Sequence, residues 1–567
     1  MRELLKDFIS RIHIAYFSME IAMRPEMQTY SGGLGILAGD TVRSCSDLDI
    51  PVVFVTLISR AGYFRQQLDP ENGQVEQPDL WDPSVYCVPL DAMIALRIEQ
   101  RPVWIRPWLY IHTSPRGHRT PVLLLDSDLD QNDAADRELT HYLYGGGESY
   151  RLKQELILGL GGIRLLQALG FDLHTYHLNE GHAAFLTLDL LNRYRFPPED
   201  VRPGEPIYDL AEVRERCVFT THTPVEAGHD RFSYDLFEKL VPELVDLGEL
   251  KQLAGANSLN MTQLALSLAG YTNGVARRHA ETTRQMFPGY RVHAITNGIH
   301  VGLWAHPAFA QLFCAHWPHW LHEPDVLVRA LQLSDQEVME CHRVAKAGFI
   351  DMVNTLTGVS LDPNIATLGF ARRMTGYKRP LLLFSDVERL IAIASRQPVQ
   401  IVLAGKAHPR DEEGKHAILR LVKLTQELRG RVTCAFLPNY DMRLAQAMVS
   451  GVDVWVNTPL PPMEASGTSG MKAALNGVLN LSVLDGWWIE ACIEGVTGWA
   501  IGEENDPGSA ETHAAVLYQK LDRIVLPLFY TEQGRWCMMM KQSIANIASY
   551  FNSQRMMRRY ASEAYLR

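Results

Sequence analysis

The chain has 567 residues, a formal net charge of -11 at pH 7 and an isoelectric point near 6.0. Because this length exceeds what a single hydrophobic core organises, at least two domains are expected. The acidic balance excludes a general nucleic-acid or anionic-membrane partner, but it leaves room for a local basic pocket.

The first half of the chain has the pattern of an interrupted α/β domain. Four apolar runs, each followed by a polar loop, predict buried strands within 51–59, 121–127, 216–224 and 291–298. The segment 60–120 carries several Pro and Trp residues in alternating patterns, which indicates an inserted β-rich segment. The first twenty residues have no signal-peptide pattern, and the eight scattered cysteines include no CxxC pair. We therefore expect reduced thiols and a cytoplasmic protein.

The second half alternates strands and helices more regularly. A long helix near 334–357 is expected to join the halves, and strands are predicted at 365–370, 400–405, 432–437, 452–457 and 478–484. With amphipathic helices between them, these strands predict a doubly wound parallel sheet. The expected organisation is an N-terminal Rossmann-like domain at 1–333, a C-terminal one at 334–512, and helices at 513–567 that pack back towards the first. Two α/β domains of similar size would face a deep cleft that holds the active site.

The stretch EASGTSGMKAALNG at 464–477 contains the most informative motif. Gly467 and Gly470 let the backbone turn tightly, and the residues from Met471 onward favour a helix, so the stretch predicts a loop that opens into a helix and can bind an anion. A buried Lys472 in the first turn could form a Schiff base with a carbonyl cofactor. Taken alone, the stretch would be better explained as a Gly-Ser loop with a solvated helix lysine.

Further polar clusters follow predicted strands. RRMTGYKR at 372–379 places four cations and a tyrosine after the 365–370 strand; a solvated charge run is the ordinary interpretation, but the position favours phosphate binding. HLNEGH at 177–182, THTP at 221–224 and TNGIH at 296–300 could hold satisfied core polar groups or simple turns. His177 and His182 lie five residues apart, which is poor helical ligand spacing, so no metal site is expected.

Together these motifs resemble the α-glucan (glycogen, starch or maltodextrin) phosphorylase family, in its short bacterial form. The matching segments extend over nearly the whole chain and include GGLG at 32–35, GYFRQ at 62–66, TNGVARRHAE at 272–281, GKAHP at 405–409, NY at 439–440 and LDGWW at 484–488. The resemblance implies two Rossmann-like domains in the GT-B glycosyltransferase architecture. It also implies pyridoxal 5'-phosphate as the cofactor.

Residue roles follow from the same resemblance, position by position. It implies that the cofactor is bound by Lys472, Thr468, Ser469, Gly470, Gly33, Tyr440, Trp304, Lys378 and Arg372. It implies that substrate is bound by Leu34, His222, Asn297, Tyr377, Glu464, Ser466 and Gly467. The catalytic set would be Arg373, Lys378, Arg372, His222 and Glu464. The chain departs from vertebrate-type enzymes at Arg372, at Thr375-Gly376 and at Ser469-Gly470.

The implied reaction is reversible, retaining transfer of a terminal glucosyl unit from an α-1,4-glucan or maltooligosaccharide to inorganic phosphate, giving α-glucose 1-phosphate. Neither nucleic acid nor membrane is an expected partner, and a homo-oligomer is compatible with the sequence. Three alternatives stay open: a nucleotide-sugar-dependent glucan synthase of the same architecture, a pyridoxal enzyme of amino-acid metabolism, and a non-catalytic glucan-binding protein.

Overall fold

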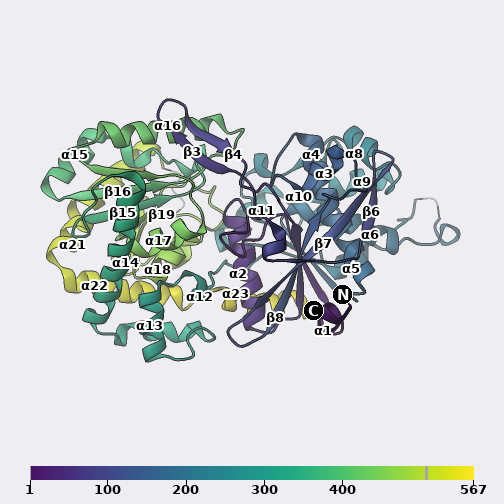
Figure 1. Cartoon of the computed structure of the whole chain (residues 1–567), viewed down its shortest axis with the longest axis horizontal. Helices are drawn as coiled ribbons and strands as arrows, with labels where there is room; N and C mark the ends of the chain where they lie inside the picture. The colour runs from purple at the N-terminus through teal and green to yellow at the C-terminus, as the bar shows by residue number, and fades with distance from the viewer. Residues whose placement is uncertain (1, 203, 505–507, 567) are drawn as a thin grey trace. The chain divides into compact units, whose positions relative to one another are not determined.

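Residue contacts divide the chain into two compact units (Figure 1). The computed structural model describes residues 2–202, 204–504 and 508–566. Unit 1 comprises Met1–Tyr63, Pro78–Ile295 and Met556–Arg567, and unit 2 comprises Phe64–Gln77 and Thr296–Arg555. The chain thus changes unit at 63/64, 77/78, 295/296 and 555/556, while the sequence-based division placed its boundaries at 333/334 and 512/513.

Unit 2 is built on a parallel sheet that has the strand order of a doubly wound α/β fold. Within the described residues the sheet has six strands, in the order β17-β16-β15-β18-β19-β20. The strands are β15 (Ala366–Ala371), β16 (Val399–Ala404), β17 (Thr433–Leu437), β18 (Val454–Asn457), β19 (Leu479–Val483) and β20 (Gly498–Ile501). Every neighbouring pair is parallel. The order reverses between β15 and β18, and open α/β sheets bind ligands beside the carboxyl ends of the strands at such a switch point.

The composition of these strands explains why they lie at the centre of the unit. All six residues of β15 and all six of β16 are buried, as expected for parallel strands covered by helices on both faces. The first five strands confirm the sequence prediction to within two residues at each end. β20 was not predicted, because a four-residue strand that begins with glycine gives almost no periodic signal.

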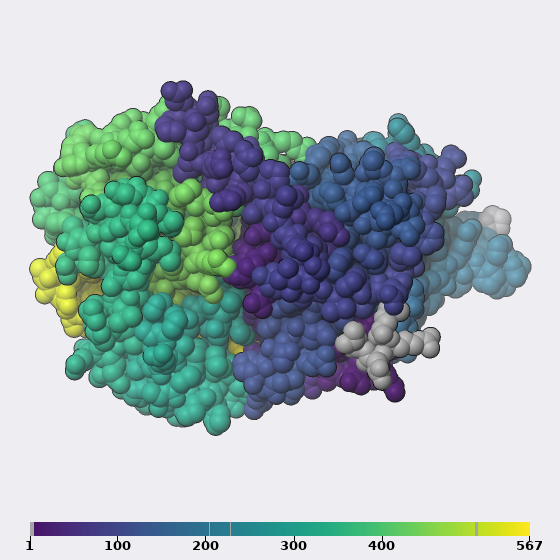
Figure 2. Space-filling view, in the orientation of Figure 1, coloured from purple at the N-terminus to yellow at the C-terminus, as the bar shows by residue number. Residues whose placement is uncertain are grey.

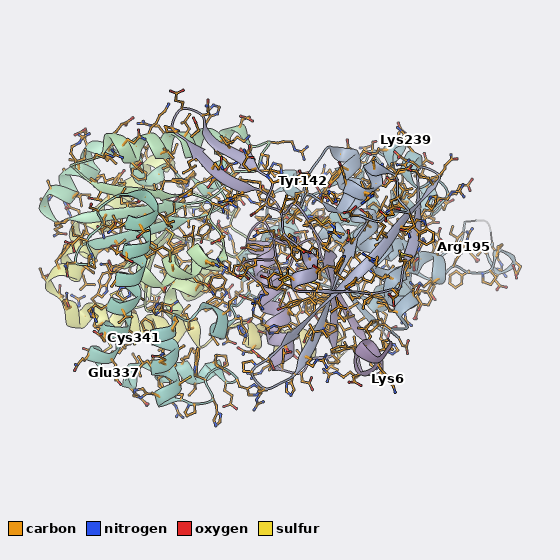
Figure 3. The ribbon with its side chains drawn as sticks, in the orientation of Figure 1. Lys6, Tyr142, Arg195, Lys239, Glu337 and Cys341 are labelled. Atoms are coloured by element: carbon orange, nitrogen blue, oxygen red, sulfur yellow. The ribbon has the colours of Figure 1, made fainter. Side chains whose placement is uncertain are left out.

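The long helix α14 (Asp335–Thr357) confirms the helix predicted at 334–357. The expectation that it joins the two halves was wrong, because it lies wholly within unit 2. Its start is fixed by a capping box in which the Ser334 hydroxyl and the Glu337 carboxylate each bond the other's backbone N–H. Figure 3 labels Glu337 and Cys341, which stand one turn apart near this end of the helix. The helix ends at Gly358, whose left-handed φ of 67° suits a residue without a side chain.

Unit 1 contains a larger mixed sheet. Among the described residues it has ten strands, ordered β14-β13-β10-β9-β1-β2-β8-β7-β5 with β6 paired to β7. The strands are β1 (Ile14–Ser18), β2 (Val52–Leu57), β5 (Val88–Pro89), β6 (Ile94–Ile98), β7 (Arg101–Thr113), β8 (Arg119–Asp126), β9 (Thr175–Asn179), β10 (Cys217–Thr220), β13 (Tyr271–Gly274) and β14 (His293–Ala294). The run from β14 to β8 is parallel, whereas β5, β6 and β7 pair antiparallel. The antiparallel part lies within the β-rich segment predicted at 60–120.

Two short segments of the chain group with the unit that is distant in sequence. The hairpin β3 (Arg65–Asp69) and β4 (Gly73–Gln77) belongs to unit 2; it is the purple element beside α16 in Figure 1, and Figure 2 shows its atoms on the green surface of that unit. Gln66 donates from its side chain to the carbonyl of Gly405 at 2.9 Å, and Gln74 to that of Ala407 at 2.9 Å. At the other end of the chain, Met556–Arg567 belongs to unit 1, where the Tyr565 hydroxyl lies 2.6 Å from His177 Nδ1.

Helices cover both sheets. In unit 1 they are α1 (Arg2–Ile9), α2 (Gly33–Asp47), α3 (Ala134–Arg137), α4 (Glu148–Leu156), α5 (Gly162–Leu169), α6 (Leu186–Arg193), α7 (Leu210–Arg216), α8 (Tyr234–Leu240), α9 (Leu247–Ala254), α10 (Met261–Leu268) and α11 (Arg277–Met286). In unit 2 they are α12 (Val301–Trp304), α13 (Pro307–His316), α14, α15 (Val387–Arg396), α16 (Glu412–Glu427), α17 (Met442–Gly451), α18 (Ser469–Leu475), α19 (Trp488–Ala491), α20 (Ala510–Lys520), α21 (Leu526–Thr531) and α22 (Gln533–Ser543). Helix α23 (Ser553–Tyr560) spans the boundary, and with α20 to α22 it confirms the helical tail predicted from 513.

Two further sequence expectations can be compared with the structure. All eight cysteines lie in the described part of the chain, and each is a free thiol in this structure. Within the same described ranges, no helix combines the length and the apolar character that a bilayer crossing needs.

Candidate active site

The carboxyl edge of the unit 2 sheet brings two predicted clusters together. Arg372 follows β15 directly, and Glu464 lies in the loop between β18 and α18. Arg372 Nη2 is 2.5 Å from Glu464 Oε2, and Lys378 Nζ is 2.5 Å from the same oxygen. The three side chains are 7 to 11% exposed, so one carboxylate is buried against two cations. The cluster lies where the strand order reverses, as the fold class predicts.

The charges of this cluster are strongly coupled. Burial alone would raise the pKa of Glu464, but Arg372 and Lys378 lower it to about 2, so the group is a carboxylate at neutral pH. Burial, and secondly the Arg372 charge, lower the pKa of Lys378 to about 8, despite the opposing effect of Glu464. The pKa of the Tyr377 hydroxyl is raised by burial and by Glu464. One carboxylate therefore does not fully compensate the two cations that it contacts.

One donor of the cluster has no acceptor. Arg372 Nη1 is buried and, among the residues that the structure describes, has no hydrogen-bond partner. A buried guanidinium N–H without a partner costs stability, because its bond to water has been lost and nothing replaces it. Arg373, the next residue, is exposed at the same edge, and its charge acts on Tyr377 and Lys378. The donor set is therefore suited to an anion with several oxygens, such as a phosphate.

The loop that carries Glu464 is held in place by Asp485. One carboxylate oxygen of Asp485 accepts the Glu464 N–H at 2.8 Å, and the other accepts the Gly486 N–H at 2.8 Å. Burial, with Glu464 as a second cause, raises the pKa of Asp485 to about 7. Sequence reasoning did not assign Asp485 a role, although the DG pair of the 484–488 motif marked its position. Its contacts make it a positioning residue for Glu464.

The loop opens into α18, which confirms the loop-to-helix prediction for this stretch. Gly467 has a left-handed φ of 89°, and a side chain on Gly470 would place its Cβ 2.4 Å from Asn480 Oδ1. Both positions therefore require glycine. The Ser469 hydroxyl accepts from the Trp455 indole at 3.1 Å, which ties the first residue of α18 to β18. Ser466 Oγ is buried, and the described residues supply it with no partner.

Lys472 lies inside α18 and is buried. Its Nζ lies 3.9 Å from the centroid of the Trp304 ring, so the amine faces an aromatic surface. Asn476 fixes both partners, because its Nδ2 donates to the carbonyls of Trp304 and Lys472 at 2.9 Å each. Its Oδ1 accepts the His306 N–H at 2.7 Å. The LNG part of the sequence motif thus has a structural explanation that sequence reasoning had not supplied.

The other predicted residues fall in both units. Asn297 is buried in unit 2, with its carbonyl accepting from Arg555 Nη2 at 3.1 Å and its side-chain oxygen unpartnered within the described ranges. Tyr440 and Thr468 also lie in unit 2, in the loops before α17 and α18. Gly33 and Leu34 are the first residues of α2 in unit 1.

His222 lies in a polar cluster of unit 1. Its Nε2 is 2.6 Å from Asn179 Oδ1, and Glu180 accepts both the His222 N–H at 2.7 Å and the Thr223 hydroxyl at 2.9 Å. Burial lowers the pKa of His222 to about 3, so the ring is neutral at physiological pH. Because Nε2 donates to Asn179, Nδ1 is the acceptor of the ring. Asn179 and Glu180 were quoted as part of a motif but not predicted as supports of His222.

Comparison with known proteins shows the family of the chain. A model of the carbohydrate phosphorylase family matches residues 231–505. Maltodextrin phosphorylase of Thermococcus litoralis is 37% identical over 97% of this chain and 70% of its own length. The chain belongs to the carbohydrate phosphorylase family. Glycogen phosphorylase of Aquifex aeolicus is 34% identical over 97% of the chain and 86% of its own length. An uncharacterized protein of Methanocaldococcus jannaschii is 29% identical over 97% of the chain and 99% of its own length.

Membership of this family confirms the resemblance drawn from the motifs, and the two units, each built on a sheet of mainly parallel strands with helices, confirm the predicted α/β fold class. It also identifies the chain as an enzyme of the glycosyltransferase type. The assignments of individual site residues stay predictions.

Proposed function

We propose that this protein is a retaining α-1,4-glucan phosphorylase, which reversibly transfers the terminal glucosyl unit of an α-glucan or maltooligosaccharide to inorganic phosphate. Its product is α-D-glucose 1-phosphate. The observation that carries the proposal is the buried pair of cations on Glu464, with Arg372 Nη1 left without an acceptor in the described structure. This excess of buried donors suits phosphate, and the family supplies the reaction class.

The residues also suit pyridoxal 5'-phosphate as the cofactor. A buried amine at Lys472, beside an aromatic ring and next to a loop of small residues, has the chemistry needed to hold a carbonyl group covalently. Lys378, Arg372, Thr468, Ser469, Gly470, Tyr440, Trp304 and Gly33 are proposed as its further ligands. When bound, the cofactor would supply a second phosphate that serves as a proton reservoir.

The side chains of the site have distinct proposed roles. Arg372, Arg373 and Lys378 would bind phosphate groups and stabilise the negative charge beside the developing oxocarbenium ion. Glu464, held by Asp485, would accept hydrogen bonds from sugar hydroxyls, while Ser466, Gly467, Asn297, Tyr377 and Leu34 would complete the sugar contacts. Neutral His222 would accept a hydrogen bond from a sugar hydroxyl at Nδ1, and its backbone carbonyl would accept another. Retention follows because the phosphate that protonates the glycosidic oxygen then attacks from the same face.

An assay with two classes of donor tests the proposal. Purified enzyme would be incubated with α-glucose 1-phosphate or a nucleotide diphosphate glucose, and with maltooligosaccharides of graded length. We expect phosphate release and chain extension from glucose 1-phosphate alone. Extension from the nucleotide sugar only would favour the glucan synthase alternative, and activity with neither would favour a binding protein.

A labelling experiment tests the cofactor proposal separately. Borohydride treatment of the holoenzyme, followed by peptide mapping, should find the cofactor attached to Lys472. Because the carbonyl serves only as an anchor in this scheme, activity should largely survive the treatment. A label on a different lysine would contradict the assignment, and complete loss of activity would favour the amino-acid type of pyridoxal chemistry.

A further inference from the structure

Two histidines of unit 1 lie next to each other at the amino ends of paired strands. His13 directly precedes β1, and His174 directly precedes β9. The strands are parallel and in register, with Ile14 opposite Thr175. The backbone N–H groups of His174 and Thr175 both donate to the His13 carbonyl, at 2.9 and 3.1 Å. The spacing of the two histidines is therefore set by the sheet.

The side chains of these histidines converge with a carboxylate. The rings of His13 and His174 have centroids 5.1 Å apart and planes tilted by 42°. With Asp172, they offer three ligand atoms that all lie within 4.8 Å of one another, and all three residues are exposed. A metal ion with ligands at roughly 2.0–2.2 Å needs its ligand atoms about 3–3.5 Å apart. Small rotations of exposed side chains would close that difference.

One hydrogen bond already selects the tautomer that binds metals. His13 Nδ1 lies 2.8 Å from the backbone carbonyl of Asp172. A carbonyl oxygen only accepts, so Nδ1 carries the proton and the lone pair of the neutral ring lies on Nε2. Metal-binding histidines commonly donate their other ring N–H to a carbonyl or carboxylate in this way, which orients the ring.

We propose that His13, Asp172 and His174 bind a divalent transition-metal ion. Two imidazoles and one carboxylate favour Zn²⁺, Co²⁺, Ni²⁺ or Cu²⁺ over Mg²⁺ or Ca²⁺, which prefer oxygen ligands throughout. Water would complete the coordination, because the site is exposed. The ion would link the segment between α1 and β1 to the loop between α5 and β9, which lies about 160 residues later in the chain. In Figure 3, the labelled Lys6 marks helix α1, which precedes the first of these segments. Because the folded unit presents the three ligands together, binding would stabilise it.

The test uses the tag-free full chain, with Zn²⁺ as the titrant and Mg²⁺ as the comparison. We expect saturable binding of one Zn²⁺ by calorimetry, a rise in the melting temperature with Zn²⁺ and not with Mg²⁺, and visible absorption bands when Co²⁺ replaces Zn²⁺. His174→Gln and Asp172→Asn should each lower the Zn²⁺ affinity at least about tenfold. Changing a residue that only hydrogen-bonds a metal ligand already costs about 10–100-fold in affinity, and these substitutions remove the ligands themselves. His416→Gln, which changes an exposed histidine on α16, should leave the affinity unchanged.

The outcome decides the proposal in either direction. Absence of saturable Zn²⁺ binding would overturn it. Binding that persists in both ligand variants would place the ion elsewhere, and would overturn it equally. Since none of the three residues belongs to the proposed active site, phosphorolysis measured without metal should be the same in wild type and variants.

Discussion

Unit 2 contains two buried clusters that each set two basic groups against one carboxylate, at opposite ends of the same sheet. At the amino end, Asp453 meets Lys346 and His342; at the carboxyl end, Glu464 meets Arg372 and Lys378. In both clusters, the neighbouring basic groups lower the pKa of a carboxyl group that burial alone would raise. The composition is similar, so the difference lies in how completely the hydrogen bonds are satisfied.

The amino-end cluster is nearly complete. Asp453 accepts from Lys346 Nζ at 2.6 Å, from His342 Nε2 at 2.9 Å and from the Thr367 N–H at 2.7 Å. Lys346 also donates to the Ile365 carbonyl at 2.8 Å. The unpartnered atom in this cluster, among the described residues, is the ring nitrogen His342 Nδ1, whereas the Lys346 ammonium has two acceptors. This cluster therefore serves to hold α14 against the sheet.

The carboxyl-end cluster is incomplete, because both cations share Glu464 Oε2 and Arg372 Nη1 has no acceptor in the described structure. The contrast indicates that a buried ion cluster becomes a candidate ligand site when its donors outnumber its acceptors. Residue type alone does not distinguish the two clusters. Four predictions test this contrast between the clusters. The one with the largest expected effect concerns the contact between Glu464 and the sugar.

If Glu464 binds the sugar, the enzyme should discriminate strongly against a donor that lacks the contacted hydroxyl. Sites that hydrogen-bond a substrate hydroxyl reject the deoxy analogue by up to about 10⁴–10⁵-fold. We expect the ratio of kcat/KM for glucose 1-phosphate to that for its 3-deoxy analogue to be large in wild type and to fall in Glu464→Gln. A wild-type ratio near one, or a ratio that the substitution leaves unchanged, would show that Glu464 does not contact the sugar.

Removing the Asp453 carboxylate should lower the free energy of unfolding. Asp453→Ala leaves Lys346 and His342 buried without their carboxylate, and such a loss costs about 3–5 kcal/mol of unfolding free energy. The measurement is denaturant unfolding, with and without added phosphate. Glu464→Ala is the matched variant: phosphate should recover much of its loss in stability, because an anion can replace the missing carboxylate. Equal recovery in both variants would remove the distinction between the clusters.

Arg373→Ala should lower phosphorolysis and leave the cofactor bound. A charge-assisted phosphate contact contributes about 1.5–3 kcal/mol, which corresponds to roughly 10–100-fold in rate before further transition-state effects. The control is Arg410→Ala, which removes another exposed arginine of unit 2. Unchanged kinetics in Arg373→Ala, with cofactor absorbance intact, would exclude Arg373 from the site.

The smallest expected effect is a pH dependence of anion binding. In the ligand-free site the pKa of Lys378 is about 8, below its ordinary value, so the amine loses its proton as the pH rises through 8. An anion binds the charged amine, so the affinity for sulfate should fall above pH 8, by at most about tenfold per pH unit for one proton. Lys378→Arg, which stays charged, should remove this step. A sulfate affinity that is constant between pH 7 and 9.5 in wild type would contradict the assignment.

The sequence predicted the elements of unit 2 better than their contacts. Strands β15 to β19 are mostly apolar and almost wholly buried, and they can be recognised in the sequence because a parallel strand is buried on both faces. The hairpin at 64–77 could not be assigned to unit 2, since its polar strands join that unit through side-chain bonds to Gly405 and Ala407 that are more than 300 residues distant. The cations after β15 pointed to the sheet edge.

The contact of both Arg372 and Lys378 with one oxygen of Glu464, which lies 92 and 86 residues away in the sequence, was not predictable from the sequence. Nor was the role of Asp485, because its effect depends on two backbone N–H groups, which every residue type except proline offers.

The most direct test of the central claim is the phosphate-dependent stability of two matched variants, Arg372→Met and Lys346→Met, in cofactor-free protein. Each removes one cation from one of the two clusters. We expect inorganic phosphate to raise the melting temperature of wild type and of Lys346→Met, though the latter melts at a lower temperature throughout. The phosphate-induced rise should be lost in Arg372→Met. A full rise in Arg372→Met would show that the carboxyl-end cluster does not bind phosphate, and would contradict the account.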